Sequence, residues 1–292
     1  MAYQKAFQLL ICNICLFIVV CLVLFYQSAG DSDPTDSKLR IFKAWNKCAK
    51  EKLSKLDNAD TFWNTYTRAI RECEQSSNVA QFNLTELKNK DETKYAIIKD
   101  TDEKKTMKFV TLGIGRDIEA EQAFQAEIHK LGQKVDFYGA DPITDVNAEL
   151  YSKIGKYFPF AIGSHAGYES ASVLENGKYL NKSVIHVELM YFLIKILKMK
   201  NIDHLWLDAE GAEYGLFDIF YNNGPLHQNN ITFCQMNLEV HMGDVKRREM
   251  FMKFVKTILE EENFGMFKNA YAGHIRLYLF NFGNSECVRK FL

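Results

Sequence analysis

The chain has 292 residues, and its 36 Lys and Arg residues nearly balance its 37 Asp and Glu residues, which leaves a net charge of −1. This balance argues against a general nucleic-acid-binding protein, which would carry a basic excess. Hydrophobic residues make up 47% of the chain and charged residues 25%, as in a folded globular protein rather than a disordered one. The 4 prolines and 16 glycines also exclude collagen-like and proline-rich architectures.

An uncharged apolar stretch of 20 residues occupies positions 7–26. As a helix it would rise about 30 Å, the thickness of the hydrocarbon layer of a bilayer. Lys5 precedes it and three aspartates follow it, so the positive-inside rule leaves the N-terminus in the cytosol. We predict a cytosolic tail over residues 1–6 and a transmembrane signal anchor over residues 7–26; a cleaved signal peptide is the alternative.

Two further features indicate a lumenal location for the remainder. Asn83, Asn181 and Asn230 each begin an Asn-x-Ser/Thr sequon for N-glycosylation. Four cysteines lie outside the apolar stretch, an even number that permits two disulfides in an oxidising compartment. We therefore expect a single-pass type II membrane glycoprotein whose large domain faces the lumen of the endoplasmic reticulum or Golgi.

Residues 27–105 are predicted to form a stem. Apolar residues recur at helical spacing over positions 39–48 and again over 62–73, which predicts a helical hairpin closed by a Cys48–Cys73 disulfide. Trp45 and Trp63 are expected to serve packing. Residues 88–108 are dense in both charge signs and are expected to be an exposed connector.

Strands and helices alternate over residues 106–292. The apolar patterns predict strands near 108–112, 135–138, 205–207, 232–240 and 275–282, and helices near 118–131, 190–197 and 247–262. This alternation predicts an α/β domain with a mostly parallel sheet and helices on both of its faces.

Ligands of such folds bind beyond the carboxyl ends of the strands. Gly113 and Gly115 follow the first strand, where a glycine turn lets a ligand approach the backbone, and Asp141 ends the second, where a carboxylate can accept the hydroxyls of a ribose. A third glycine is missing and Asp117 stands near its place, which disfavours a pyrophosphate. An adenosyl ligand without phosphates, such as S-adenosylmethionine, fits this pattern better.

Acidic side chains gather after the later strands. Asp208, Glu210 and Glu213 lie within six residues of one another, and Glu239 and His241 end the next strand on one side of it. Such groups can act as a general base, contact a sulfonium or amine, or hold a metal ion. Glu213 is expected to be structural, and a satisfied structural pair is the alternative for Glu239 and His241.

The stretch IDHLWLDAEGAE at residues 202–213 resembles the signature of FkbM-type methyltransferases. FYGADP at 137–142 and FAIGSHAG at 160–167 are similar to that family's neighbouring segments. With the N-terminal anchor and stem, the layout resembles nematode-type members. The resemblance implies a class I, Rossmann-like methyltransferase that depends on S-adenosylmethionine and usually methylates oxygen.

The resemblance also implies roles for individual residues. Gly113 and Gly115 would border the methionine part of the cofactor, Asp141 would bind its ribose, and Ser164 would approach its adenine.

For catalysis, the resemblance places Asp208 near the transferred methyl group and Glu210 close by. Asp208 or His241 would take the proton of an acceptor hydroxyl on a small molecule or glycan. No metal is expected in this function. Two alternatives stay open: a lumenal glycosyltransferase with Asp208 and Glu210 as its metal site, and an inactive methyltransferase-like binding module.

Overall fold

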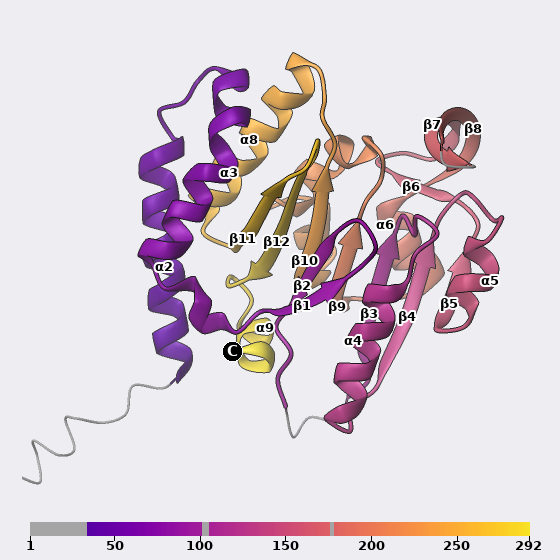
Figure 1. The fold of residues 1–292 in the computed structure, drawn as a ribbon, viewed down its shortest axis with the longest axis horizontal. Coiled ribbons are helices and arrows are strands. Elements are labelled where there is room, and N and C mark those ends of the chain that lie inside the picture. The colour runs from indigo at the N-terminus through magenta and orange to yellow at the C-terminus, as the bar shows by residue number, and fades with distance from the viewer. Residues whose placement is uncertain (1–33, 101–104, 176–177) are drawn as a thin grey trace, which may run out of the picture. The chain divides into compact units, whose positions relative to one another are not determined.

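The computed structural model describes residues 34–100, 105–175 and 178–292, and residues 38–292 form one compact unit (Figure 1). The predicted tail and signal anchor lie outside the described residues. Within the part of the chain that the structure describes, no helix is long and apolar enough to cross a bilayer.

A seven-stranded mixed sheet forms the centre of this unit, in the order β11-β12-β10-β9-β3-β4-β5. The five strands from β10 to β5 are parallel to one another. At the other edge, β12 pairs antiparallel with β10, and β11 pairs antiparallel with β12. This confirms the predicted α/β fold with a mostly parallel sheet. The strands are β3 (Met107–Leu112), β4 (Val135–Ala140), β5 (Gly155–Phe158), β9 (Asn201–Leu207), β10 (Thr232–Val240), β11 (Phe264–Tyr271) and β12 (Ile275–Asn281).

The connections between these strands are mostly helical. They are α4 (Glu119–Lys130), α5 (Asn147–Ser152), α6 (Leu189–Tyr191), η2 (Phe192–Leu197), η3 (Ala212–Phe220), α7 (Pro225–Gln228) and α8 (Val245–Glu261), with α9 (Ser285–Phe291) at the C-terminus. A small separate sheet, β6 (Ala161–Gly163), β7 (Gly167–Glu175) and β8 (Lys178–Glu188), follows β5.

One predicted helix, at residues 190–197, differs from the structure. After the single turn α6, the chain widens into the π-helix η2 and ends at Lys198 in the left-handed region. Leu189, Phe192 and Leu193 are fully buried, so packing against the sheet determines the local geometry there and overrides the regular 3.6-residue period.

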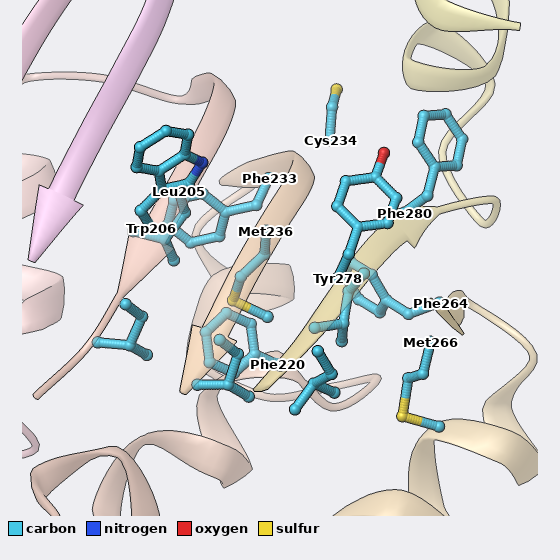
Figure 2. Close-up of a cluster of buried hydrophobic side chains, with 14 of the residues drawn as sticks. Leu205, Trp206, Phe220, Phe233, Cys234, Met236, Phe264, Met266, Tyr278 and Phe280 are labelled. Carbon is cyan, nitrogen blue, oxygen red and sulfur yellow. The ribbon is translucent and has the colours of Figure 1, made fainter. Parts of the chain in front are cut away.

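The core of the sheet is built from large side chains on its central and antiparallel strands. Figure 2 shows Trp206 of β9, Phe233 and Met236 of β10, and Tyr278 and Phe280 of β12 side by side. Each is at most 2% exposed, and burying such side chains is the main stabilising contribution to a domain of this size.

The helical hairpin predicted for the stem is present as α2 (Pro34–Leu53) and α3 (Ala59–Ser76). Asn58 caps α3 by accepting a hydrogen bond from the Thr61 amide at 2.9 Å. Cys48 and Cys73 form the predicted disulfide, with 5.6 Å between their Cα atoms. The predicted packing role of both tryptophans is confirmed, because Trp45 and Trp63 are buried.

This hairpin covers the β11 edge of the sheet. α3 packs against β11 and α8, and the ring of Tyr66 meets that of Phe251 at 5.0 Å, edge to face. Trp45 of α2 meets Phe267 of β11 at the same centroid distance, 5.0 Å. The helices and the sheet thus share one apolar core.

The expected exposed connector at residues 88–108 is wrong in part. After the short helix η1 (Val79–Phe82), the strands β1 (Thr85–Lys88) and β2 (Thr93–Ala96) form a hairpin that lies over the sheet (Figure 1). Lys94 is only 8% exposed and Ala96 is fully buried. The high charge density of this stretch predicts solvent exposure, but Lys94 is buried and its charge is balanced by Glu92 inside the fold.

Two side-chain amides of β10 hold the hairpin in place. The Tyr95 amide donates to Asn237 Oδ1, and Asn237 Nδ2 donates to the Tyr95 carbonyl, both at 2.8 Å. Gln235 makes the same pair of bonds with Ile97, at 2.7 Å and 3.1 Å. These amides satisfy backbone groups of β2 and of the residue after it, Ile97, that would otherwise lack partners.

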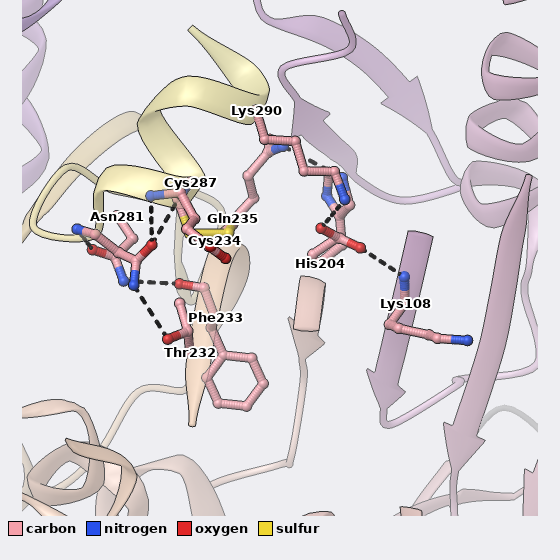
Figure 3. The surroundings of a disulfide bond; sticks show 12 residues. Lys108, His204, Thr232, Phe233, Cys234, Gln235, Asn281, Cys287 and Lys290 are labelled. Atoms are coloured by element: carbon pink, nitrogen blue, oxygen red, sulfur yellow. Dashed lines mark hydrogen bonds and ion pairs between the residues drawn. A yellow bond between two sulfur atoms is a disulfide. The ribbon is translucent and has the colours of Figure 1, made fainter. Parts of the chain in front are cut away.

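A second disulfide ties the C-terminal helix α9 to β10. Cys234 and Cys287 are bonded, and Asn281 Nδ2 donates to the Phe233 carbonyl at 3.0 Å beside them (Figure 3). Both disulfides therefore join segments that are distant in sequence, with separations of 25 and 53 residues.

Replacing Cys48 and Cys73 together by serine should lower the free energy of unfolding by about 3.5 kcal/mol, because the 25-residue loop is no longer closed in the unfolded chain. Urea unfolding of the full chain measures this. The matched pair Cys234→Ser and Cys287→Ser opens a 53-residue loop and should cost about 4 kcal/mol. A double serine variant as stable as the parent would contradict the expectation.

Candidate active site

The site begins where β3 and β9 lie side by side and the chain leaves them in different directions. From β3 the chain proceeds to β4 and β5 on one side, whereas β9 leads to β10 on the other. This reversal of strand order is the switch point where ligands of α/β sheets bind.

Gly113 makes the close backbone contact at this point. Its φ is +89°, and a Cβ atom there would lie 1.8 Å from the Asp208 carbonyl oxygen. The Asp208 amide donates to the Leu112 carbonyl at 2.8 Å, so the turn after β3 packs directly on the first residue after β9. A side chain at position 113 would force these two segments apart.

A cavity of about 690 Å³ opens at the switch point. It brings together six of the seven predicted site residues: Gly113, Gly115, Asp141, Ser164, Asp208 and Glu210. Four of these were assigned to a cofactor and two to catalysis, and they come from segments up to about 100 residues apart in the sequence. The seventh, His241, lies behind Asp208 and Glu210 and touches both.

The carboxylate of Asp141 is fixed at the end of β4. Its Oδ2 accepts a hydrogen bond from the Ile114 amide at 2.9 Å, and its Oδ1 accepts one from the Ile143 amide at 2.8 Å. Each carboxylate oxygen has two lone pairs, so each can still accept a bond from a ligand hydroxyl. The glycine turn and the acidic strand end are thus linked through Ile114.

The remaining cofactor candidates lie along the same cavity. Gly115 has a φ of +65° and nothing within 4 Å of the position that a Cβ would take, so its backbone is open to a ligand. Ser164 follows β6, and its Oγ lies 3.1 Å from His165 Nδ1, whose Nε2 in turn lies 2.8 Å from Glu169 Oε1. The glycine backbone, a carboxylate acceptor and a hydroxyl group together form a set of polar groups that fits an adenosyl group with its amino-acid tail.

His241 lies at the centre of a group of carboxylates. Its Nε2 is 3.2 Å from Glu210, 3.5 Å from Asp208 and 3.9 Å from Glu239, and its Nδ1 is 3.3 Å from Glu213. These carboxylates outweigh the effect of burial and raise the pKa of His241 to about 11. The imidazole is therefore positively charged at neutral pH.

Glu213 orients this imidazole. It is fully buried, accepts from the His241 amide at 2.8 Å and the Gly211 amide at 2.7 Å, and faces His241 Nδ1. The sequence-based expectation of a structural role agrees with these bonds, although the residue that Glu213 positions belongs to the site.

The pKa of the Asp208 carboxyl group is also raised, but here the rise favours the uncharged form. Burial and the nearby Glu239 raise the pKa of its carboxyl group to about 8, despite the opposing effects of Lys94 and His241. Its side chain is 31% exposed, and it lines the cavity, but its Oδ1 is buried and has no hydrogen-bond partner among the described residues. This Oδ1 faces the His241 imidazolium at 3.5 Å, so the exposed part of the carboxylate, which lines the cavity, is what can take a proton from a bound hydroxyl.

The β1–β2 hairpin contributes residues that sequence reasoning missed. The Lys94 ammonium pairs with Glu92, lies 5.3 Å from the centre of the Trp206 ring, and is close enough to Asp208 to affect its pKa. Arg276 of β12 donates to Glu239 at 2.9 Å. Lys94 and Glu92 belong to no motif, and they reach the site through tertiary contacts of the hairpin, among them the hydrogen bonds of Asn237 and Gln235 and the contacts of Arg276 with Asp91 and Glu92.

Overlapping sets of these side chains have the spacing of metal ligands. They are Asp208, Glu210 and His241; Glu239, His241 and His274; and Glu92, Asp208 and Glu239. A divalent ion there would have to displace the proton of His241 or the Lys94 ammonium, which already compensate the carboxylates.

A mostly parallel sheet with a glycine turn and an acidic strand end at its switch point is the arrangement found in nucleoside-binding α/β folds. Residues 55–286 match the family described as Methyltransferase FkbM domain, and the chain belongs to this family.

One solved structure, of the citrinin polyketide synthase CMeT domain, matches with a TM-score of 0.31 and 9% identity; the match covers 74% of this chain and 52% of that one. The chain thus spans about half the length of that protein. A comparison with curated proteins found no match.

His241→Gln should destabilise the fold by about 3 kcal/mol at pH 8, because it leaves buried carboxylates without their central cation. The folded pKa of His241 lies above its ordinary 6.5, so the stabilisation is complete below that pH and is lost only as the pH rises towards 11. The parent therefore holds the full stabilisation at pH 5, and the loss in the variant should be larger there than at pH 8.

Urea unfolding at the two pH values measures both effects. His227→Gln, at an exposed histidine, is the matched control and should change little. An equal loss at pH 5 and pH 8 would contradict the electrostatic explanation.

Proposed function

We propose that this protein transfers a methyl group from S-adenosylmethionine to a hydroxyl oxygen of a small molecule or glycan. The observation that carries the proposal is the cavity onto which Gly113, Gly115, Asp141 and Asp208 open at the switch point. Membership of the FkbM methyltransferase family supports the reaction class.

When bound, the cofactor supplies an activated methyl group on a sulfonium. The chain's own residues hold the reactants and manage the proton. Asp141 binds the ribose hydroxyls, the Gly113–Gly115 backbone borders the amino-acid tail, and Ser164 lies at the adenine end. Holding the reacting atoms in line contributes much of the rate, because it removes the entropy of bringing them together.

Asp208 is the base in this proposal, and His241 is not. The imidazolium of His241 has no free lone pair at neutral pH, because its pKa is raised to about 11 by the surrounding carboxylates. The Asp208 side chain is 31% exposed and lines the cavity, so its carboxylate can accept the proton of the acceptor hydroxyl, while its buried Oδ1 faces His241 Nε2 at 3.5 Å. His241 forms an ion pair with Glu210 at 3.2 Å, which fixes the positive charge of the imidazolium beside Asp208.

The lumenal, membrane-anchored placement is part of the same proposal. Two disulfides support an oxidising compartment. Asn83, Asn181 and Asn230 are all exposed, so each sequon is accessible for glycosylation. A signal anchor at residues 7–26 would place residues 27–292 on the lumenal side.

The alternatives make different predictions for binding. The family match does not support a glycosyltransferase, whereas an inactive methyltransferase-like module would keep the fold and lack transfer. Tritiated methyl transfer without added metal supports the proposal. Stimulation by Mn²⁺ with a nucleotide sugar, or no thermal shift with S-adenosylmethionine, would replace it with one of the alternatives.

Asp141→Asn should weaken binding of S-adenosylhomocysteine at least tenfold, because an amide loses one charged acceptor for the ribose hydroxyls. Isothermal titration calorimetry on the full chain measures the affinity. Asp145→Asn is the matched control, since the side chain of Asp145 is 77% exposed. Unchanged affinity in a folded Asp141→Asn variant would remove the ribose assignment.

The rate of methyl transfer should rise as the pH increases through about 8, where Asp208 loses its proton and becomes a base. Asp208→Asn should lower kcat at least a hundredfold and flatten the profile. The folded pKa of Asp208 lies above its ordinary 3.8, so its ionisation destabilises the fold as the pH rises towards 8.

Asp208→Asn should therefore unfold at a higher temperature than the parent at pH 9, while its activity is lost. Thermal unfolding and a pH–rate series measure the two effects. A rate independent of pH in the parent would show that another group takes the proton.

A further inference from the structure

A second cavity, of about 440 Å³, lies beside the first at the same end of the sheet. Its walls come from the β1–β2 loop, the last residues of β10, and strands β11 and β12. This volume is within the range of ligand pockets in proteins. Among the described residues, none lines both cavities.

The two cavities meet at one cluster of side chains. Asp208 lines the larger cavity, whereas Glu92 and Glu239 line the smaller one. One carboxylate oxygen from each of the three lies within 4.8 Å of the others. This group of three carboxylates therefore lies at the boundary between the two cavities.

Most of the residues that line the smaller cavity are polar or charged, and their aliphatic stems also give it apolar surface. Twelve of its 16 residues are polar or charged, and only Leu238, Ala270, Ala272 and Leu277 are apolar. The lining includes ammonium, guanidinium and amide donors as well as carboxylate acceptors, and the Tyr95 ring adds an aromatic face with the Lys268 ammonium 5.3 Å from its centre. A sugar hydroxyl both donates and accepts hydrogen bonds, so this lining matches a carbohydrate better than an aromatic alcohol.

Given the methyltransferase function proposed above, we propose that the smaller cavity binds the methyl acceptor and that this acceptor is a carbohydrate. Its reacting hydroxyl enters the space between Glu92, Glu239 and Asp208. Glu92 and Lys94 are positioning residues: Lys94 holds Glu92, and both are supplied by the β1–β2 hairpin.

The reaction balances with these groups alone. The hydroxyl oxygen forms a bond to the methyl carbon as the carbon–sulfur bond breaks, and the hydroxyl proton passes to the Asp208 carboxylate. The products are a methyl ether, S-adenosylhomocysteine and a protonated Asp208, which then releases its proton to solvent.

Ala270→Trp tests the assignment by filling the smaller cavity from a partly exposed strand position. The full chain, saturated with S-adenosylhomocysteine, is applied to a glycan array of neutral and acidic oligosaccharides. The parent should bind a subset of them, and Ala270→Trp should bind at least tenfold more weakly. Ala44→Trp, on an exposed face of α2, is the matched control and should bind like the parent.

Lys268→Ala provides a second variant that does not depend on accommodating a large side chain, and it should weaken glycan binding about fivefold. In all variants, calorimetry should give an unchanged affinity for S-adenosylhomocysteine, because none of these residues lines the larger cavity.

Binding of no glycan by the parent, or equal binding by the parent and both cavity variants, would overturn the inference. Methylation of catechol in preference to every oligosaccharide would also overturn it. Failure of the proposed function is a separate result, because the parent would then not bind S-adenosylhomocysteine at all.

Discussion

The balance of buried charge at the carboxyl end of the sheet is the constraint on which the rest of this structure depends. Five carboxylates converge there and face three cations; the carboxylates are Glu92, Asp208, Glu210, Glu213 and Glu239, and the cations are Lys94, His241 and Arg276. Buried charges are tolerated only when they are paired and hydrogen-bonded. Each element that supplies a cation must therefore be held accurately against the sheet.

Three separate devices provide that accuracy. The hairpin that carries Lys94 is fixed by the amide side chains of Gln235 and Asn237. The imidazole of His241 is oriented by Glu213, and Arg276 is held by the antiparallel pairing of β12 with β10. One carboxylate, Asp208, remains incompletely compensated, and its pKa is raised in consequence. An ionisable group left in this state at a cavity is a common feature of functional sites.

Much of the fold could be predicted from the sequence, because its patterns are local. The alternation of strands and helices indicated the α/β sheet, and β10 has the predicted bounds Thr232–Val240. The spacing of apolar residues identified the α2–α3 hairpin and its disulfide. Strand ends carry site residues in this topology, so the positions of Gly113, Asp141 and Asp208 in the apolar pattern were enough to select them as candidates.

The missed parts depend on contacts between distant segments. Lys94 lies in a charge-rich stretch, and nothing local indicates that it is buried next to Trp206, more than 100 residues away. The π-helix η2 likewise follows from packing rather than from its own sequence period. The charge state of His241 could not be inferred either, because it depends on how closely the carboxylates of residues 208–213 approach the end of β10 in the fold.

The way in which β2 is attached has a consequence for how such a protein can diversify. Its backbone pairs with side chains of β10 rather than with the edge of the main sheet, so the hairpin adds no strand to the sheet order. Substitutions at residues 89–92 therefore leave the pairing of the main-sheet strands unchanged, although Asn89 and Lys90 are bonded to Ala120 and Asp117 at the start of α4 and Glu92 belongs to the charge cluster. Selectivity for one reactant can evolve in one short segment while the recognition of the other is conserved.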